Sequence, residues 1–143
     1  MSGDEAAAVW AHMCSLVLDN VRREEVTEAL GMSFFRVKAL RRIAAATAPI
    51  KLAALASKLN TDRPYLTLVV DDLTKRGLVV RTPHPTDRRS KLVSVTPAGA
   101  EAAAEADRIL GTPPQALRQL DEGELKVLAG IMEGLLSDPR ATI

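Results

Sequence analysis

The sequence contains few of the residues that mark secreted or membrane proteins. Among 143 residues there is a single cysteine, Cys14, so no internal disulfide can form. Aromatic side chains make up only 3% of the chain. No apolar run approaches the ~18 residues that a membrane span needs. The first ten residues, MSGDEAAAVW, are acidic and lack the basic and then apolar order of a signal peptide. We therefore expect a cytoplasmic protein with no membrane partner.

The motifs of common enzymes and metal sites are also missing from the sequence. There is no nucleophile elbow and no phosphate-binding glycine loop. The two histidines, His12 and His84, are far apart, and no Cys/His/carboxylate cluster has the spacing of metal ligands. We therefore expect a protein that is not an enzyme and that holds neither a metal nor a cofactor.

The charge of the chain is unevenly distributed. The net charge is only +1, yet residues 34–91 contain 13 Lys/Arg and 4 Asp/Glu, a local balance of +9. The two flanks together contain 6 basic and 14 acidic residues, a balance of −8. A basic segment between acidic flanks indicates that the middle of the chain binds a polyanion such as nucleic acid. The alternative is a merely solvated charged surface, on which both signs would be mixed.

The spacing of apolar residues predicts a mainly helical chain. Helical periodicity predicts helices over residues 4–29, 34–46, 52–59, 63–76 and 97–110, and Asp121 with Glu124 forms a capping box for a last helix. The helix over 63–76 has Asp62 as its N-cap and ends at Gly77. It is expected to turn four apolar residues toward the core: Leu66, Val69, Val70 and Leu73.

Two β-rich runs at residues 78–82 and 91–95 predict a hairpin. The eight residues between them, PHPTDRRS, are rich in proline, charge and turn formers. Two short helices joined by a tight turn and followed by such a hairpin are typical of a winged helix-turn-helix, whose second helix enters the major groove of DNA. The predicted fold class is therefore mainly α with a small β-hairpin wing.

Residues 52–99 resemble the DNA-binding segment of the MarR (multiple antibiotic resistance) family of transcription regulators. The segment LTKRGLV at 73–79 resembles the family's L-x-x-x-G-L-V, and Asp87-Arg88-Arg89 resembles its D-x-R. The segment VTPAG at 95–99 resembles L-T-x-x-G, with valine in place of leucine. The resemblance implies a homodimer in which the first and last helices interlock and two winged lobes bind a pseudo-palindromic DNA site.

The resemblance divides the chain into three parts. Residues 1–33 are expected to form an N-terminal dimerisation helix, residues 34–96 the winged helix-turn-helix lobe, and residues 97–143 the helices that complete the dimerisation domain. The broad apolar face of the last helix agrees with a dimer, because a single subunit of this size has little else to cover it. The alternative is that this face packs only within its own subunit.

The candidate DNA-binding residues lie on the helix after Asn60 and on the hairpin. They are Lys51, Thr61, Arg63, Pro64, Tyr65, Thr67, Leu68, Arg88, Arg89 and Lys91. In the family the wing aspartate helps to fix an arginine that enters the minor groove, which assigns these roles to Asp87 and Arg89. The alternative is an ordinary exposed ion pair between them.

The helix over 63–76 departs from the family's pattern. The family commonly has small hydroxyl residues where Pro64 and Tyr65 stand, and often a basic residue in the place of Leu68. Asp71 and Asp72 would also repel any phosphate that approached them. We therefore expect Arg63, Tyr65 and Thr67 to make most of the base contacts, while the preferred DNA sequence stays undefined.

MarR-family regulators often release DNA when a small aromatic or anionic effector binds. The candidate effector-binding residues are Trp10, His12, Met13, Phe35 and Arg36, and the alternative is that they are core residues. Peroxide-sensing members carry a reactive cysteine on the first helix, held by tyrosine hydroxyls. The single tyrosine of this chain, Tyr65, is expected to be remote from Cys14, which argues against such a role.

The sequence thus predicts a dimeric, DNA-binding transcriptional regulator, and the family's usual behaviour favours a repressor. Two other functions stay open. A winged lobe can serve as a platform for protein interaction, which Leu68 and the paired aspartates favour slightly. Non-specific, architectural DNA binding is the other, and its affinity would depend almost entirely on counterion release.

Overall fold

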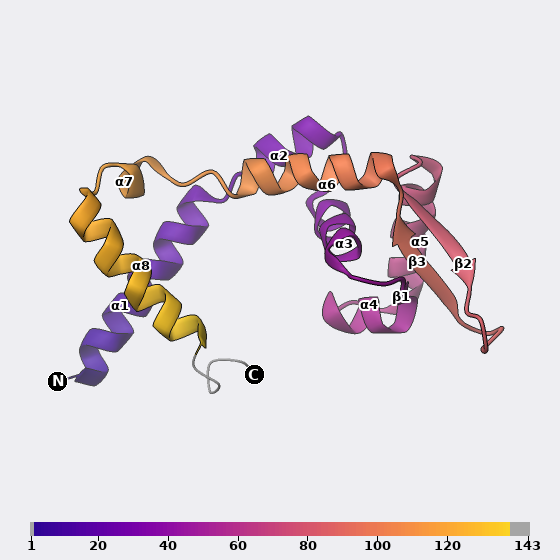
Figure 1. The fold of residues 1–143 in the computed structure, drawn as a ribbon, viewed down its shortest axis with the longest axis horizontal. Coiled ribbons are helices and arrows are strands. Elements are labelled where there is room, and N and C mark those ends of the chain that lie inside the picture. Colours follow the sequence, from indigo (N-terminus) through magenta and orange to yellow (C-terminus); the bar gives the residue numbers. More distant parts are fainter. Residues whose placement is uncertain (1, 138–143) are drawn as a thin grey trace. The chain divides into compact units, whose positions relative to one another are not determined.

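Helices account for most of the residues that the structure, a computed structural model, describes (residues 2–137). The chain divides into two compact units, residues 1–111 and 112–143. The first unit contains helices α1 (Ser2–Asn20), α2 (Arg23–Leu30), α3 (Phe34–Ala45), α4 (Leu52–Lys58), α5 (Arg63–Lys75) and α6 (Pro97–Leu110), and strands β1 (Ile50–Lys51), β2 (Val79–Pro83) and β3 (Lys91–Val95) (Figure 1). The second unit contains α7 (Gln115–Arg118) and α8 (Glu122–Ser137). None of the described helices combines the length and the apolar character that a membrane crossing needs.

Helices α2 to α6 and the sheet share one apolar core, and we call residues 23–110 the lobe. The four residues of α5 that were predicted to face the core are confirmed as buried: Leu66, Val69, Val70 and Leu73. They pack with the buried faces of α3 and α4, and α6 joins the same core through Ala103, Ala106 and Ile109. The winged helix-turn-helix fold, mainly α with a β-hairpin, is therefore confirmed.

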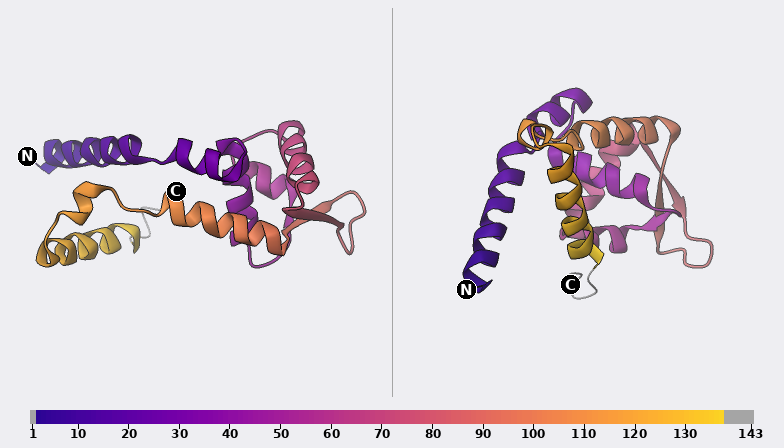
Figure 2. Two further views of the ribbon diagram at one scale, coloured as in Figure 1. Left: turned by 90° about the horizontal axis from the view of Figure 1, so that it is seen from above. Right: turned by 60° about the vertical axis from the view of Figure 1, so that its left-hand side comes forward.

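The hairpin belongs to a three-stranded antiparallel sheet. The strand order is β1-β3-β2, with Val79 opposite Val95 and Pro83 opposite Lys91 in the hairpin. The connecting loop, which we call the wing (residues 84–90), extends beyond the helices of the lobe (Figures 1 and 2). Strand β1 could not be predicted, because two residues carry no periodicity and this strand exists only through its pairing with β3.

Four of the helices are preceded by an N-cap residue whose side chain accepts a backbone hydrogen bond. The side chain of Ser33 accepts from the Arg36 N–H, that of Asp62 from the Tyr65 N–H, and that of Thr96 from the Gly99 N–H. The predicted capping box of the last helix is also present. In it the Asp121 N–H donates to Glu124 Oε1 at 3.1 Å, and the Glu124 N–H donates to Asp121 Oδ1 at 2.8 Å. Each cap satisfies donors that have no partner inside the helix, so these helix starts follow from local sequence.

The predicted single helix over residues 4–29 is wrong. The helix ends at Asn20, whose side-chain amide donates to the Leu16 carbonyl at 2.8 Å, and Arg22 is not helical. No proline or glycine marks this break. It separates α1, whose side chains are exposed or half-buried, from α2, which buries Val26 in the core of the lobe. The short helix α7 was also missed by the sequence analysis.

Helices α1 and α8 each carry large apolar side chains that the chain leaves exposed. On α1 these are Val9, Trp10, Leu16, Val17 and Leu18. On α8 they are Leu125, Val127, Ile131, Leu135 and Leu136. The described residues of α8 include none that is buried. The division of the chain into dimerisation and DNA-binding parts stays a prediction, to which these exposed faces are relevant.

Candidate nucleic-acid interface

The first turn of α5 presents exposed side chains on a rigidly capped helix. The left-handed backbone of Asn60 (φ 53°) makes the tight turn after α4, and Asp62 then caps α5 at 2.7 Å from the Tyr65 nitrogen. Arg63 is exposed and makes no ion pair with any residue that the structure describes. Its guanidinium is therefore available to a phosphate or to the edge of a base.

The other predicted contact residues of α5 differ in whether their side chains already make contacts within the lobe. The ring of Tyr65 packs on Phe35 of α3, with centroids 5.1 Å apart and planes inclined by 57°. The Thr67 hydroxyl donates to the Arg63 carbonyl at 2.9 Å. Leu68 is 63% exposed and, having no polar atom, can offer only an apolar contact such as one with a thymine methyl.

The wing is held by a set of short-range hydrogen bonds. Nδ1 of His84 accepts from the N–H groups of Thr86 and Asp87 at 3.2 and 3.1 Å. Oδ1 of Asp87 accepts from the Arg89 N–H at 3.0 Å, and its Oδ2 accepts from the Ser90 hydroxyl at 2.9 Å. The wing loop is thus ordered by two side chains that bind its own backbone.

Asp87 binds the backbone of Arg89 rather than its guanidinium. Neither Arg88 nor Arg89 forms an ion pair within the described residues, so the alternative of an Asp87–Arg89 ion pair does not hold. The hydrogen bonds from the Arg89 N–H and the Ser90 hydroxyl lower the pKa of Asp87, and the nearby positive charge of Lys51 lowers it further. The carboxylate therefore stays charged at neutral pH while both arginines of the wing remain exposed.

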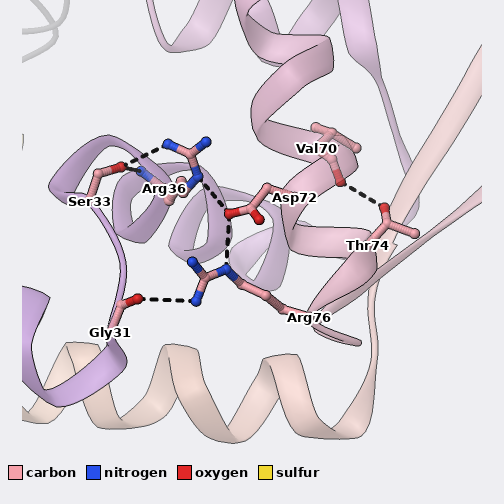
Figure 3. A network of polar contacts seen from close by, with 7 residues as sticks. All are labelled: Gly31, Ser33, Arg36, Val70, Asp72, Thr74 and Arg76. Carbon is pink, nitrogen blue, oxygen red and sulfur yellow. Dashed lines mark hydrogen bonds and ion pairs between the residues drawn. The ribbon is translucent and has the colours of Figure 1, made fainter.

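The two aspartates that were expected to repel phosphates are both paired with arginines. Asp71 forms an ion pair with Arg81 of β2 at 2.6 Å. Asp72 lies between Arg36 and Arg76 (Figure 3), at 2.8 and 2.9 Å from their Nε atoms. Each carboxylate is neutralised within the lobe, so the helix carries less free negative charge than the sequence suggested.

The candidate effector residues are not gathered into one site by the contacts of the structure. Phe35 packs on Tyr65, and Arg36 is bound to Asp72, so both are engaged with α5. Trp10 of α1 is 67% exposed, which is unlike a core residue of a single subunit. Cys14 is a free, half-buried thiol.

Comparison with known proteins gives one consistent result. Residues 36–91 match the MarR family. The chain is 33% identical over 84 residues to a putative transcriptional regulatory protein for the hcr operon of Thauera aromatica, and 34% identical over 77 residues to the multiple antibiotic resistance protein MarR of Escherichia coli K12. These matches cover 58% and 54% of the chain, and in both cases the chain spans about half the length (51%) of the relative. The crystal structure of wild-type apo MarR from E. coli superposes with a TM-score of 0.70 at 25% identity, covering 88% of this chain and 96% of that one. The chain is therefore similar to MarR-family regulators in sequence over residues 36–91, and similar to a solved MarR structure in fold over most of its length.

The motif residues that carried the MarR resemblance have structural reasons in this chain. Gly77 has φ 77° and ends α5 in a conformation that favours glycine. Gly99 lies against the Leu78 carbonyl oxygen, which a Cβ atom would overlap. The same oxygen accepts from the Thr96 N–H at 3.0 Å, and the Thr96 hydroxyl donates to the Gly77 carbonyl at 2.6 Å. These contacts hold the base of the hairpin against the end of α5.

Members of the MarR family are transcription regulators and not enzymes, in agreement with the sequence analysis. The sequence analysis missed the arginines that neutralise the aspartates of α5, above all Arg81 and Arg76, and the role of His84 in ordering the wing. A proline-flanked histidine three residues before Asp87 was the only local signal for that role.

Proposed function

We propose that the chain is a MarR-type transcriptional repressor that binds a pseudo-palindromic DNA site as a homodimer. The observation that carries the proposal is the presence of exposed, unpaired arginines on two elements of one lobe. Arg63 lies at the start of α5, and Arg88 and Arg89 lie on a wing ordered by Asp87 and His84. A helix in the major groove and a wing arginine in the narrow minor groove are the contacts that this geometry supports.

The other proposed contacts lie around these arginines. Lys51 in β1 and Lys91 in β3 are exposed at the base of the wing and suit contacts with phosphates. The surface that we propose to enter the groove is completed by Thr61, in the turn before α5, and by Pro64, Tyr65, Thr67 and Leu68 of α5. Because its aspartates are paired, α5 does not oppose an approaching DNA backbone with two free carboxylates.

The exposed apolar faces of α1 and α8 support the homodimer. A second copy of the chain offers the same two faces, and covering them removes large apolar side chains from water. We propose that residues 1–33 and 97–143 contribute these helices to the dimerisation domain, while α6 also anchors the lobe through its buried alanines.

We extend the proposal to release from DNA by a small aromatic or anionic effector. Trp10, His12 and Met13 on α1 are the proposed contacts, with Phe35 and Arg36 on α3. An effector that engages Phe35 or Arg36 competes with their contacts to Tyr65 and Asp72 of α5. Such competition would link effector binding to the helix that we propose to contact DNA.

Fluorescence anisotropy on the DNA upstream of the chain's own gene tests the proposal. Binding that survives scrambled competitor is expected for the wild type, and Arg63→Ala and Arg89→Ala should each weaken it by ~1–3 kcal/mol. The matched control is Arg42→Ala, because Arg42 is an exposed arginine of α3 that forms no ion pair with the described residues. If any competitor DNA displaced the upstream DNA equally well, the protein would be an architectural DNA binder. If the protein bound no DNA at all, a protein-interaction module would be favoured.

A further inference from the structure

One carboxylate oxygen of Asp72 joins three segments of the lobe. Oδ2 accepts from Nε of Arg36 on α3 at 2.8 Å and from Nε of Arg76 at the end of α5 at 2.9 Å. Arg76 in turn donates through Nη1 to the carbonyl of Gly31, the C-cap of α2, at 3.1 Å. Nη1 of Arg36 donates to the hydroxyl of Ser33, the N-cap of α3, at 3.2 Å (Figure 3). Asp72 therefore links α5 to both sides of the turn between α2 and α3.

The charges of this network make the carboxylate indispensable to it. Two guanidinium groups share one oxygen, so without the Asp72 charge two cations would face each other. The hydrogen bonds from Arg76 and then from Arg36 lower the pKa of Asp72. The side chains of Arg36 and Asp72 are only 25% and 33% exposed, so salt screens this pair less than an ion pair in open solvent.

A second contact joins α5 to the start of α3. Tyr65 packs on Phe35, the neighbour of Arg36 in the sequence. Tyr65 and Asp72 are seven residues apart, which is close to two helical turns, so they lie on the same side of α5. The beginning of α3 thus holds α5 at two points, one near each end of the helix.

Because Asp72 lies far from Arg63 along α5, a small tilt of the helix at Asp72 moves Arg63 by a larger distance. Nine residues at 1.5 Å per residue place them about 13.5 Å apart along the helix. A tilt of about 5° at Asp72 would move the beginning of a rigid helix by roughly 1 Å, enough to misalign hydrogen bonds whose donor–acceptor distances span about 0.5 Å. The apolar face of α5 holds it to the core, but non-directional packing sets its tilt less strictly than paired hydrogen bonds do.

We propose that Asp72 is a positioning residue for the proposed DNA-contacting helix. Its bridge between Arg36 and Arg76 fixes the tilt of α5 against the α2–α3 turn and so sets how well the protein distinguishes its operator from other DNA. This inference rests on the proposed function. It assigns a role in specificity to a carboxylate that is not among the proposed DNA contacts.

The test compares Asp72→Asn with the wild type on an operator duplex and on a scrambled duplex of equal length. We expect the ratio of the two affinities to fall about tenfold, the size of one lost base contact. The affinity for scrambled DNA should not fall, and the salt dependence should keep its slope because no phosphate contact is lost. Asp72→Glu, which keeps the charge, should recover part of the ratio.

The matched control is Asp107→Asn. Asp107 is also an aspartate bound to an arginine of α3, Arg41, at 2.6 Å, but it joins α3 to α6 instead of α5. The Asp107→Asn substitution should leave the ratio of operator to scrambled-DNA affinity unchanged. If Asp72→Asn fails to fold by circular dichroism, Arg36→Gln, which keeps the contact between Asp72 and Arg76, is measured with the same expected direction.

The outcomes separate this inference from the proposed function. A wild-type protein that does not distinguish operator from scrambled DNA overturns the proposed function. A wild-type protein that does, together with a folded variant whose ratio is unchanged, overturns the role of Asp72 alone. An equal loss in Asp107→Asn, or a smaller salt slope in Asp72→Asn, would also contradict it.

Discussion

The lobe and the helices α1 and α8 contain similar apolar residues, but the lobe buries most of them and the two helices leave them exposed. In the lobe, Leu40, Leu55 and Leu73 are fully buried, and the large apolar side chains that stay exposed are those of Tyr65, Leu68 and Val80. On α1 and α8, leucines such as Leu18 and Leu136 stay exposed. The lobe is therefore complete as a single copy. The helices at either end of the chain have apolar faces that one copy does not cover, which is why we propose that a second copy covers them.

The largest expected effect comes from a cavity in the lobe. Leu40→Ala removes a fully buried side chain of α3 and should lower the free energy of unfolding by ~2–5 kcal/mol. Urea denaturation at two protein concentrations should give the same loss at both, because the cavity lies within one subunit. A loss below ~1 kcal/mol would show that the lobe is not packed as the structure describes.

The next effect is expected on α8 and should depend on protein concentration. Ile131 is 54% exposed in one copy. Ile131→Glu would place a charge in the proposed dimer interface and should weaken the dimer at least ~tenfold, the equivalent of ~1.4 kcal/mol. Sedimentation velocity over a range of concentrations measures this. Lys126→Gln on the same helix changes the charge by the same single unit and should leave the dimer intact. If neither variant affects the dimer, α8 is not the interface.

The smallest effect concerns the ionic contacts of the lobe and is lost in acid. The pKa of Asp72 is lowered in the folded state, so its charge stabilises the fold at pH values above the usual aspartate range, near 4. The stabilisation is lost as the pH falls through the lowered folded pKa. The difference in unfolding free energy between the wild type and Asp72→Asn should therefore be constant from pH 7 to 5 and shrink below pH 4. A difference that persists undiminished to pH 2 would show that the charge is not its cause.

Much of this fold could be predicted from the sequence because its signals are local. Asp62, Thr96 and the Asp121–Glu124 pair cap their helices through residues three positions away. The break after Asn20 could not be predicted in this way, because it depends on which side chains the lobe buries and not on a proline or a glycine. Strand β1 was missed for a similar reason, since its two residues are held only by pairing with β3.

The features of the candidate site also differ in whether local sequence could predict them. The exposed arginines of α5 and the wing were predictable from motif and helical spacing. The pair between Asp72 and Arg76 has the i,i+4 spacing of a helical ion pair, so the sequence could have indicated it. The contact between Asp72 and Arg36 could not be predicted, because Arg36 lies 36 residues away in the sequence and meets Asp72 only after the lobe has folded. From the sequence, Asp71 and Asp72 were expected to repel phosphates. In the folded lobe both are paired with arginines.

We propose that two lobes, joined by helices whose apolar faces one copy leaves uncovered, bind one DNA site. The most direct measurement is the stoichiometry on DNA, obtained by titrating a fluorescent upstream duplex and determining the mass of the complex by sedimentation. We expect two protomers per full site, bound together, with a half-site duplex bound far more weakly. One protomer bound equally well to full and half sites would contradict it.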